Sequence, residues 1–282
     1  MPPLVSVGMP VYNRLDQTRR AINSILNQSY KNLEIIISND CSPIPEMYKM
    51  LDEFAAKDKR IKLIHQPEDL GCYGNYYFVQ HHATGEYFMY AQDDDWWNSD
   101  YIEKLVINLE NNPQNAFALS HSFYVETNGK LWHDFRFDNQ NILSFIFGEK
   151  NPFVWMSLWR TKELRKFDYT KDEQHGKDII IAAEALMSYP FGYVDETYYY
   201  KTIYHDKAMQ YIKSDTFCHF KMYGSLLYRV VTSKYAKRKY LIVIMIPAAV
   251  VGIVRLYTAY LLFKLPVDHP IRNFVRKIAR SF

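Results

Sequence analysis

Short runs of β-branched and other apolar residues alternate with amphipathic segments of helical length through the first 122 residues. This alternation is typical of βαβ units built around a mainly parallel sheet. We expect five strands, at Leu4–Met9, Leu33–Ser38, Ile61–Ile64, Glu86–Ala91 and Ala116–His121. We expect four helices between them, at Gln17–Asn27, Pro45–Ala56, Asn75–Ala83 and Ser99–Asn111. The pattern predicts an α/β fold with half of a Rossmann-type sheet, whose ligands gather at the carboxyl ends of the strands.

The pattern is weaker after residue 122. Residues 123–170 contain aromatic stretches, such as Phe135–Phe137 and Phe145–Phe147, without a clear period, and we expect loops and short strands there. A helix over Lys177–Met187 and a strand over Phe191–Tyr200 are expected to follow. The sequence therefore predicts one domain over residues 1–220, with halves at about 1–122 and 123–220.

Residues 221–282 have a different character and form a separate predicted unit, a helical appendage. Leu241–Val254 carries no charge, and apolar character resumes after Arg255 as far as Phe263. The run is shorter than the roughly 20 residues that cross a bilayer, so the sequence leaves open whether it spans, lies in or only touches a membrane. His269–Arg280 is amphipathic, with arginines opposite its apolar face, as in helices that bind membrane surfaces. The alternative for the apolar run is a buried core or a dimerisation helix, which would make the protein a homodimer.

The overall charge of +3 hides a strong asymmetry. From Lys221 onward the chain has 12 Lys or Arg and one acidic residue, a charge of +11, whereas the first 220 residues carry −8. The basic tail predicts an anionic membrane surface as partner, and no nucleic-acid recognition motif accompanies it. The three cysteines lack metal-ligand spacing, and the amino terminus lacks the features of a signal peptide. We therefore expect the body at the cytoplasmic face of the plasma membrane.

Three consecutive aspartates, Asp93, Asp94 and Asp95, lie between an apolar run and the pair Trp96–Trp97. Adjacent carboxylates repel one another, so their crowding at the end of a predicted strand favours a bound cation. Mg²⁺ and Mn²⁺ commonly bridge one or two protein carboxylates to a substrate diphosphate. The alternative is a solvated acidic turn that caps the next helix.

Four segments in order resemble the family 2 glycosyltransferases, which have the GT-A nucleotide-sugar fold; these segments are Val5–Asn13, Ile36–Ser42, Gly71–Asn75 and Gly85–Trp97. The resemblance covers roughly residues 3–210. It implies that the first half of the domain binds the nucleotide and that the second half is on the acceptor side.

The resemblance also assigns nucleotide-binding residues. It implies that Pro10, Tyr12 and Asn13 line the nucleoside pocket and that Asp40 hydrogen-bonds the base. An ionised Asp40 could accept a hydrogen bond from a uracil or guanine N–H, and the alternative for it is an Asx-turn or a helix cap. The resemblance further implies that the segment beginning at Gly71 and containing Asn75 flanks the diphosphate.

In the family, the acidic motif reads Asp-any-Asp-Asp before an aromatic pair. This alignment implies that Asp94 is the metal ligand, with Asp95 beside it in the metal site. The leading acidic position is Gln92 here, so Asp93 is implied to help hold the ribose or the metal. The implied cofactor is Mn²⁺ or Mg²⁺, which acts as a Lewis acid on the departing nucleoside diphosphate.

An inverting transfer requires a general base that deprotonates the acceptor hydroxyl. The segment His175–Glu184 resembles the family's helix that supplies this base and implies Asp178, with Asp172 and Glu173 as rivals. A purely structural alternative is that Asp178 stabilises the helix N-terminus. Lys201 and His205, in a Tyr-rich segment similar to one in the family, are implied to contact the diphosphate or to cover the site. The alternative is an ordinary aromatic strand with an exposed histidine.

These observations predict a bacterial, metal-dependent, inverting glycosyltransferase with a nucleotide-sugar donor, a UDP-sugar being favoured. The expected acceptor is a glycan or a polyprenyl-linked intermediate of cell-surface polysaccharide synthesis at the membrane. The alternatives are a nucleotidyltransferase, although the sequence has no P-loop, and a non-catalytic membrane-bound scaffold that binds nucleotides or glycans.

Overall fold

The computed structural model describes residues 1–127, 129–135, 154–167 and 177–203. His205, Asp172, Glu173 and the predicted appendage over 221–282 lie outside the described residues. In the part of the chain that is described, no helix is both long enough and apolar enough to cross a membrane.

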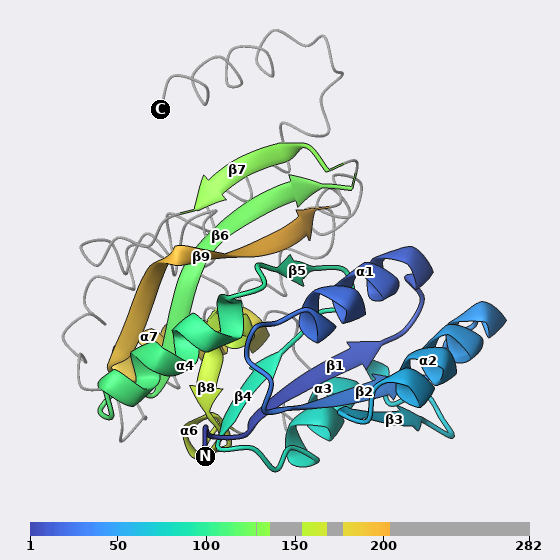
Figure 1. The fold of residues 1–282 in the computed structure, drawn as a ribbon, viewed down its shortest axis with the longest axis horizontal. Coiled ribbons are helices and arrows are strands. Elements are labelled where there is room, and N and C mark those ends of the chain that lie inside the picture. Colours follow the sequence, from blue (N-terminus) through green and yellow to red (C-terminus); the bar gives the residue numbers. More distant parts are fainter. Residues whose placement is uncertain (128, 136–153, 168–176, 204–282) are drawn as a thin grey trace, which may run out of the picture.

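The described strands form one mixed sheet with the order β3-β2-β1-β4-β8-β6-β9-β5, and β7 pairs with β6 (Figure 1). The first four strands of this order run parallel; they are β1 (Val5–Val11), β2 (Leu33–Asn39), β3 (Ile61–His65) and β4 (Tyr87–Tyr90). The remaining strands are β5 (Trp96–Trp97), β6 (Phe117–Glu126), β7 (Leu131–Phe135), β8 (Leu158–Arg160) and β9 (Phe191–Ile203). Strand β8 is antiparallel to its neighbours β4 and β6, whereas β6 and β9 are parallel.

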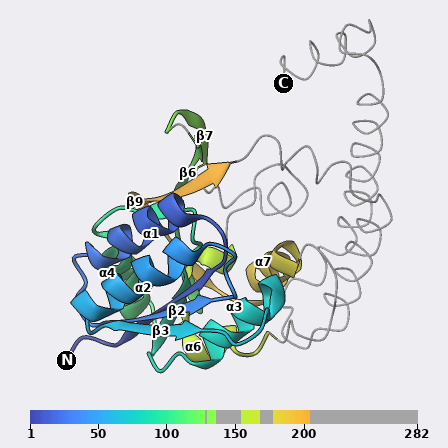
Figure 2. The same ribbon diagram turned by 90° about the vertical axis from the view of Figure 1, so that its right-hand side faces the viewer.

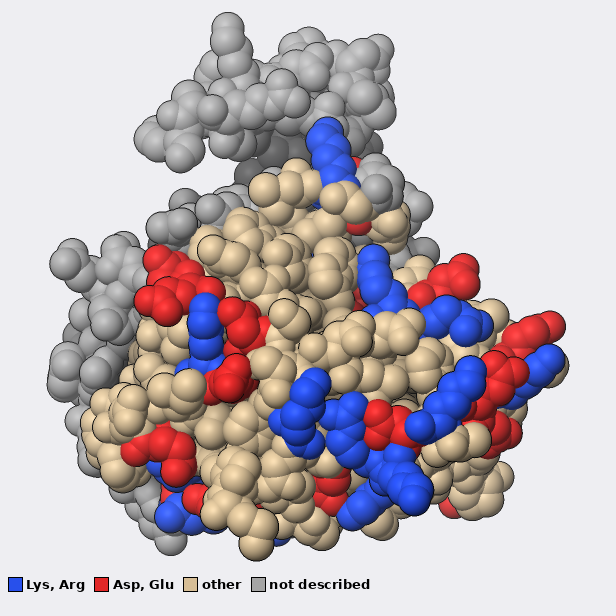
Figure 3. All heavy atoms as spheres, in the orientation of Figure 1, with Lys and Arg blue, Asp and Glu red and all other residues tan. Residues whose placement is uncertain are grey.

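Helices cover both faces of this sheet. Figure 2 shows α1, α2 and α4 on one face and α3 and α7 on the other. The helices are α1 (Leu15–Leu26), α2 (Pro45–Lys57), α3 (Gly71–His81), α4 (Tyr101–Asn111), α6 (Thr161–Leu164) and α7 (Lys177–Ser188), with a 3₁₀ turn, η2, at Val154–Met156. Because helices cover the sheet on both faces, every residue of β1 and of β2 is buried, as expected for central parallel strands. Figure 3 shows that Lys and Arg are interspersed with Asp and Glu on the surface over α1 and α2.

The predicted fold class is confirmed for the body of the chain, and several boundaries are corrected. The predicted strand Ala116–His121 continues to Glu126, because it pairs along its length with β9, which itself reaches Ile203. Helix α3 begins at Gly71, four residues before the predicted start at Asn75. Strand β5 was not predicted, since two residues give no periodicity, and it exists because Trp96 and Trp97 pair with Tyr200 and Tyr199.

A buried carboxylate, Glu34 on β2, connects β2 to the turn before β4. Its oxygens accept hydrogen bonds from Lys62 Nζ at 2.5 Å and from the backbone N–H of Thr84 at 2.5 Å and Gly85 at 3.1 Å, and also from the Ser6 hydroxyl. Burial alone would raise the pKa of Glu34, but these hydrogen bonds outweigh it and lower the pKa to about 2.

Replacing Glu34 with glutamine should therefore reduce stability and change its pH dependence. A pKa lowered on folding adds stability that is present above the unfolded value near 4.5 and is lost as the pH falls toward 2. We expect the free energy of unfolding at pH 7 to fall by about 2 kcal/mol, and the loss of stability between pH 5 and 2 to become shallower. Urea titrations across that pH range measure both effects. The exposed Glu46→Gln is the control, and equal acid sensitivity of Glu34→Gln and wild type would contradict the assignment.

Candidate active site

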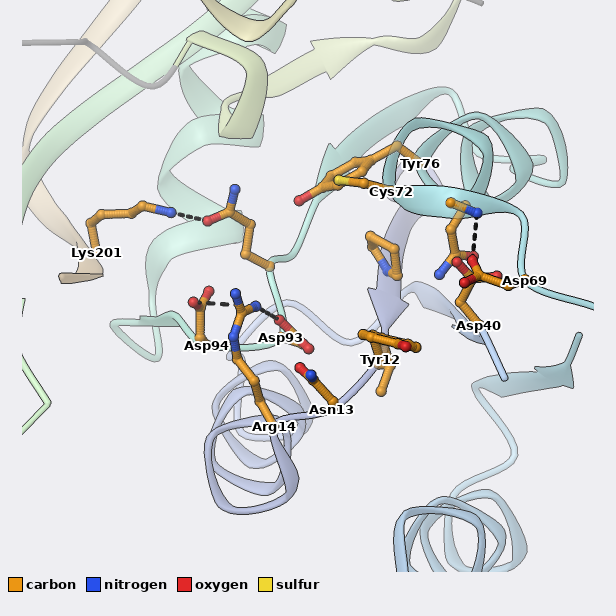
Figure 4. A pocket seen from close by; sticks show the side chains of 15 residues that line it. Tyr12, Asn13, Arg14, Asp40, Asp69, Cys72, Tyr76, Asp93, Asp94 and Lys201 are labelled. Atoms are coloured by element: carbon orange, nitrogen blue, oxygen red, sulfur yellow. Dashed lines mark hydrogen bonds and ion pairs between the residues drawn. The ribbon is translucent and has the colours of Figure 1, made fainter. Parts of the chain in front are cut away.

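A cavity of about 550 Å³ opens at the carboxyl ends of β1, β2 and β4 (Figure 4). It brings together nine residues that the sequence assigned to the site; these are Pro10, Tyr12, Asn13, Asp40, Gly71, Asn75, Asp93, Asp94 and Lys201. Strand ends place them, because each loop that leaves a parallel strand at this edge contributes to the same crevice. The cavity is also lined by residues to which sequence reasoning gave no role; these include Arg14, Asp69, Cys72 and Tyr76.

Asp40 follows β2 and is fixed at one end of the cavity. Its backbone N–H donates to the Val11 carbonyl at 2.9 Å, and its Oδ1 accepts from the Leu70 N–H at 2.8 Å. The chain turns sharply after it, since Cys41 has a φ of 51°. Burial, followed by the nearby Asp69 carboxylate, raises the pKa of Asp40. Asp40 does not cap α2, because the first turn of that helix has no side-chain cap. Its carboxylate instead accepts from the Leu70 N–H at the start of α3.

Two residues of α3 shape the wall next to Asp40. Gly71 starts the helix with a φ of +71°, a conformation that favours glycine, and its N–H donates to Asp69 Oδ1 at 2.7 Å. Asn75 is buried, and its Nδ2 donates to the Ser38 carbonyl at 3.0 Å. The other polar atom of this amide, Oδ1, is buried at the cavity and has no hydrogen-bond partner within the described part of the chain. A buried acceptor of this kind is costly unless a ligand donates to it.

The acidic motif lies at the opposite end of the cavity, where Arg14 reaches it from the start of α1. Arg14 Nη1 is 2.6 Å from Asp93 Oδ1 and 3.3 Å from Asp94 Oδ2, and Figure 4 shows the guanidinium between the two carboxylates. Burial raises the pKa of Asp93 to about 6, while Arg14 lowers it and Asp94 raises it. The two carboxylates at the cavity are therefore held close together by a protein cation.

Asp95 has different surroundings from its two neighbours. It is fully buried and is not among the lining residues. Its Oδ1 accepts from the Thr202 N–H at 2.8 Å, and its Oδ2 accepts from Lys201 Nζ at 3.3 Å and from the Tyr199 hydroxyl. Burial raises the pKa of Asp95 to about 7 despite the charge of Lys201. These contacts anchor β9 to the acidic motif, and the role of Asp95 as a metal ligand stays a prediction.

Lys201 connects β9 to the cavity. Its ammonium group donates to Gln92 Oε1 and to Asp95, and its side chain lines the cavity. Its contact with a diphosphate stays a prediction. Gln92, which replaces the leading acid of the family motif, thus holds a cation at the site. Behind it, the Arg20 guanidinium donates to the Asp94 carbonyl at 2.8 Å and lies 3.9 Å above the Trp96 ring.

The predicted general base is only partly located. Asp178 is the second residue of α7, a helix that packs against η2, and its side chain lies outside what the structure describes. Asp172, Glu173 and His205 are also outside the described residues. The structure therefore leaves the assignment of the base as a prediction.

The residues at the cavity fit a divalent cation that is shared with a diphosphate. Mg²⁺ and Mn²⁺ prefer oxygen ligands and are usually held by one or two carboxylates together with substrate phosphates, and Asp93 and Asp94 present such oxygens. Among the described residues, no three or more His, Cys, Asp or Glu side chains are grouped so as to hold a metal by themselves.

A four-stranded parallel half-sheet in the order β3-β2-β1-β4, with an acidic motif and a cavity at its carboxyl edge, is typical of the GT-A class of glycosyltransferase folds. The chain belongs to glycosyl transferase family 2, whose family model matches residues 6–188.

A related sequence agrees with this family assignment, and solved structures agree with the fold. A putative colanic acid biosynthesis glycosyl transferase of Escherichia coli, WcaA, is 32% identical over 126 residues, which are 44% of this chain and 44% of the relative. The structure of Staphylococcus aureus TarS residues 1–349 with UDP-GlcNAc has a TM-score of 0.74 at 15% identity, over 94% of this chain and 77% of that 1–349 chain. The mannosyltransferase PcManGT from Pyrobaculum calidifontis, with GDP-Man and Mn²⁺, has a TM-score of 0.62 at 12% identity, over 100% of this chain and 81% of PcManGT. The matched segments make up 27%, 18% and 48% of the lengths of the first three curated relatives.

Proposed function

We propose that the protein transfers a sugar from a nucleotide-sugar donor, with UDP-sugars favoured, to a membrane-associated glycan or lipid-linked acceptor. The transfer inverts the configuration at the anomeric carbon and uses Mn²⁺ or Mg²⁺ as cofactor. The observation that carries the proposal is the cavity itself, which joins a carboxylate at one end, Asp40, to a charged cluster of Arg14, Asp93, Asp94 and Lys201 at the other. A nucleoside diphosphate has the matching order of groups, a base that carries N–H donors and a diphosphate that carries negative charge.

The residues of the cavity divide the work of binding. Asp40 accepts a hydrogen bond from the base, and Tyr12, which is partly exposed beside it, packs on the nucleoside. The orphaned Oδ1 of Asn75 accepts a hydrogen bond from a ligand group, which relieves the cost of its burial. Lys201 contributes positive charge at the diphosphate end.

Asp93 and Asp94 would hold the metal. When bound, the metal stabilises the negative charge that develops on the leaving diphosphate. In the transfer itself, the acceptor hydroxyl oxygen forms a bond to the anomeric carbon while the bond from that carbon to the diphosphate oxygen breaks. The hydroxyl proton passes to the Asp178 carboxylate, and the nucleoside diphosphate leaves.

The acceptor and the location are proposed on the properties of residues 221–282. The charge of +11 and the apolar run favour a cytoplasmic membrane surface, where lipid-linked glycans are accessible. The role that the name of WcaA gives to that relative, colanic acid biosynthesis, is consistent with synthesis of a cell-surface polysaccharide.

Calorimetric titration of UDP and GDP, each with and without Mn²⁺, tests the proposal. We expect UDP to bind in the presence of Mn²⁺, and Asp40→Ala to weaken this binding by about tenfold through loss of a charge-assisted hydrogen bond to the base. Tighter binding of GDP than of UDP would redirect the proposal to a GDP-sugar, the donor class present in PcManGT. Binding of neither diphosphate would refute the proposed function. Asp52→Ala removes a carboxylate outside the cavity and is the matched control.

A further inference from the structure

Arg14 occupies the position between Asp93 and Asp94 that a cation at the acidic motif would be expected to take. Its guanidinium is 2.6 Å and 3.3 Å from the two carboxylates, whose side chains are each only 7% exposed. Two carboxylates this deeply buried repel one another and need a counter-ion. In this structure that counter-ion is Arg14, a residue of the chain itself.

The arrangement of the third aspartate shows that Arg14 serves this pair in particular. Asp95 has its own cation in Lys201, along with hydrogen bonds from Tyr199 and Thr202. Arg14 is the basic residue that pairs with Asp93 and Asp94 among the ion pairs of the described residues. A divalent ion that binds these carboxylates would therefore meet the positive charge of a guanidinium already paired with both of them.

Arg14 also lines the cavity, and its side chain is 31% exposed, so it can reach a ligand that enters. A guanidinium displaced from two carboxylates needs another anion, and a diphosphate offers oxygens in the geometry that arginine pairs with in a bidentate manner. Arg14 is the residue just before α1, so its backbone is held at the start of that helix. Rotation about its side-chain bonds can then redirect the guanidinium.

We propose that Arg14 is an exchangeable counter-ion that makes metal binding and nucleotide binding depend on each other. Without a nucleotide it neutralises Asp93 and Asp94 and opposes metal binding. When a metal and a nucleoside diphosphate enter together, the carboxylates take the metal and Arg14 turns to the diphosphate. Each ligand then removes the cost that the other would meet alone, which is positive coupling between them. This inference rests on the proposed function, because it requires a nucleoside diphosphate ligand.

Binding of Mn²⁺ and UDP to the full chain, each alone and both together, tests the inference without any measurement of turnover. Electron paramagnetic resonance measures free Mn²⁺, and calorimetry measures UDP. For Arg14→Gln we expect Mn²⁺ alone to bind about tenfold more tightly than to wild type, UDP with Mn²⁺ to bind about tenfold more weakly, and the coupling between the ligands to fall accordingly. Arg19→Gln removes the same charge from an exposed position on α1 outside the cavity, and it should match wild type.

A second variant keeps the test decisive if circular dichroism shows that Arg14→Gln does not fold. Arg14→Lys keeps the positive charge but presents one point charge instead of a planar fork. We expect it to bind Mn²⁺ alone within about threefold of wild type and to lose part of the coupling.

The possible failures can be told apart. If folded Arg14→Gln binds Mn²⁺ alone no more tightly than wild type, the role of Arg14 is wrong and the proposed function stands. If Arg14→Gln does not fold, full coupling between Mn²⁺ and UDP in Arg14→Lys leads to the same conclusion. If wild type binds neither UDP nor GDP with Mn²⁺ present, the proposed function fails and the inference fails with it.

Discussion

Replacing Asp94 with alanine is expected to abolish metal-dependent binding of UDP and to lower the rate of sugar transfer by about a thousandfold, because the metal contributes several kcal/mol to stabilising the leaving group. Asp94 is the residue that the family motif assigns to the metal, and its carboxylate lies at the cavity with 7% exposure. Its removal also leaves Arg14 paired with Asp93 at 2.6 Å, a contact that further opposes the entry of a metal.

Titration of UDP with and without Mn²⁺ measures the first effect, and release of UDP from a donor measures the second. Asp16→Ala, an exposed carboxylate on α1 that does not line the cavity, is the matched control for the change in charge. If Asp94→Ala retained the dependence of UDP binding on Mn²⁺, Asp93 would replace Asp94 as the principal ligand.

Replacing Asp178 with asparagine should reduce transfer by about 10²- to 10⁴-fold, the range that a positioned general base contributes. Donor binding should be unchanged, because Asp178 is on α7. The nucleotide cavity is lined from the end of β1 and the loop after it, the residue after β2, α3 and the loop before it, the acidic motif and β9. Asparagine keeps the size of the side chain and removes its ability to accept the proton of the acceptor hydroxyl.

A comparison of transfer rate with calorimetric UDP affinity separates catalysis from binding. Glu184→Gln makes the equivalent change six residues further along the same helix and is the control for a general effect on α7. Unchanged transfer in Asp178→Asn would move the role of the base to Asp172 or Glu173. Wild type that binds donor but shows no transfer to any acceptor would support the non-catalytic scaffold.

The first half of the fold could be predicted because its signals are local. Strands β1 to β4 are short apolar runs between amphipathic segments, and their parallel order brings the loops after them to one edge whatever the details of packing. Tyr12, Asp40 and Asp94 could therefore be placed at one site from their positions at the ends of strands. The later boundaries were less accurate, since β6 and β9 extend as far as they do by pairing with each other.

Arg14 directly follows the first motif, at the carboxyl end of the first strand, but no role was predicted for it because its partners are distant along the chain. Its partner Asp93 is 79 residues away in the sequence. A basic residue directly after the first strand, in a chain with an acidic motif at the end of another parallel strand, is the signal that could have indicated the contact.

The sequence by itself determined the class of fold, the family and the edge of the sheet where the site lies, because hydrophobic periodicity and motif order are properties of the chain. Only the tertiary structure decided how the three adjacent aspartates divide. Asp93 and Asp94 meet Arg14 at the cavity, while Asp95 is buried against Lys201, Tyr199 and Thr202 of β9. The physical reason is that a carboxylate's role follows from the charges and donors that surround it, and β9 and the start of α1 supply these from parts of the chain about 100 residues and about 80 residues away.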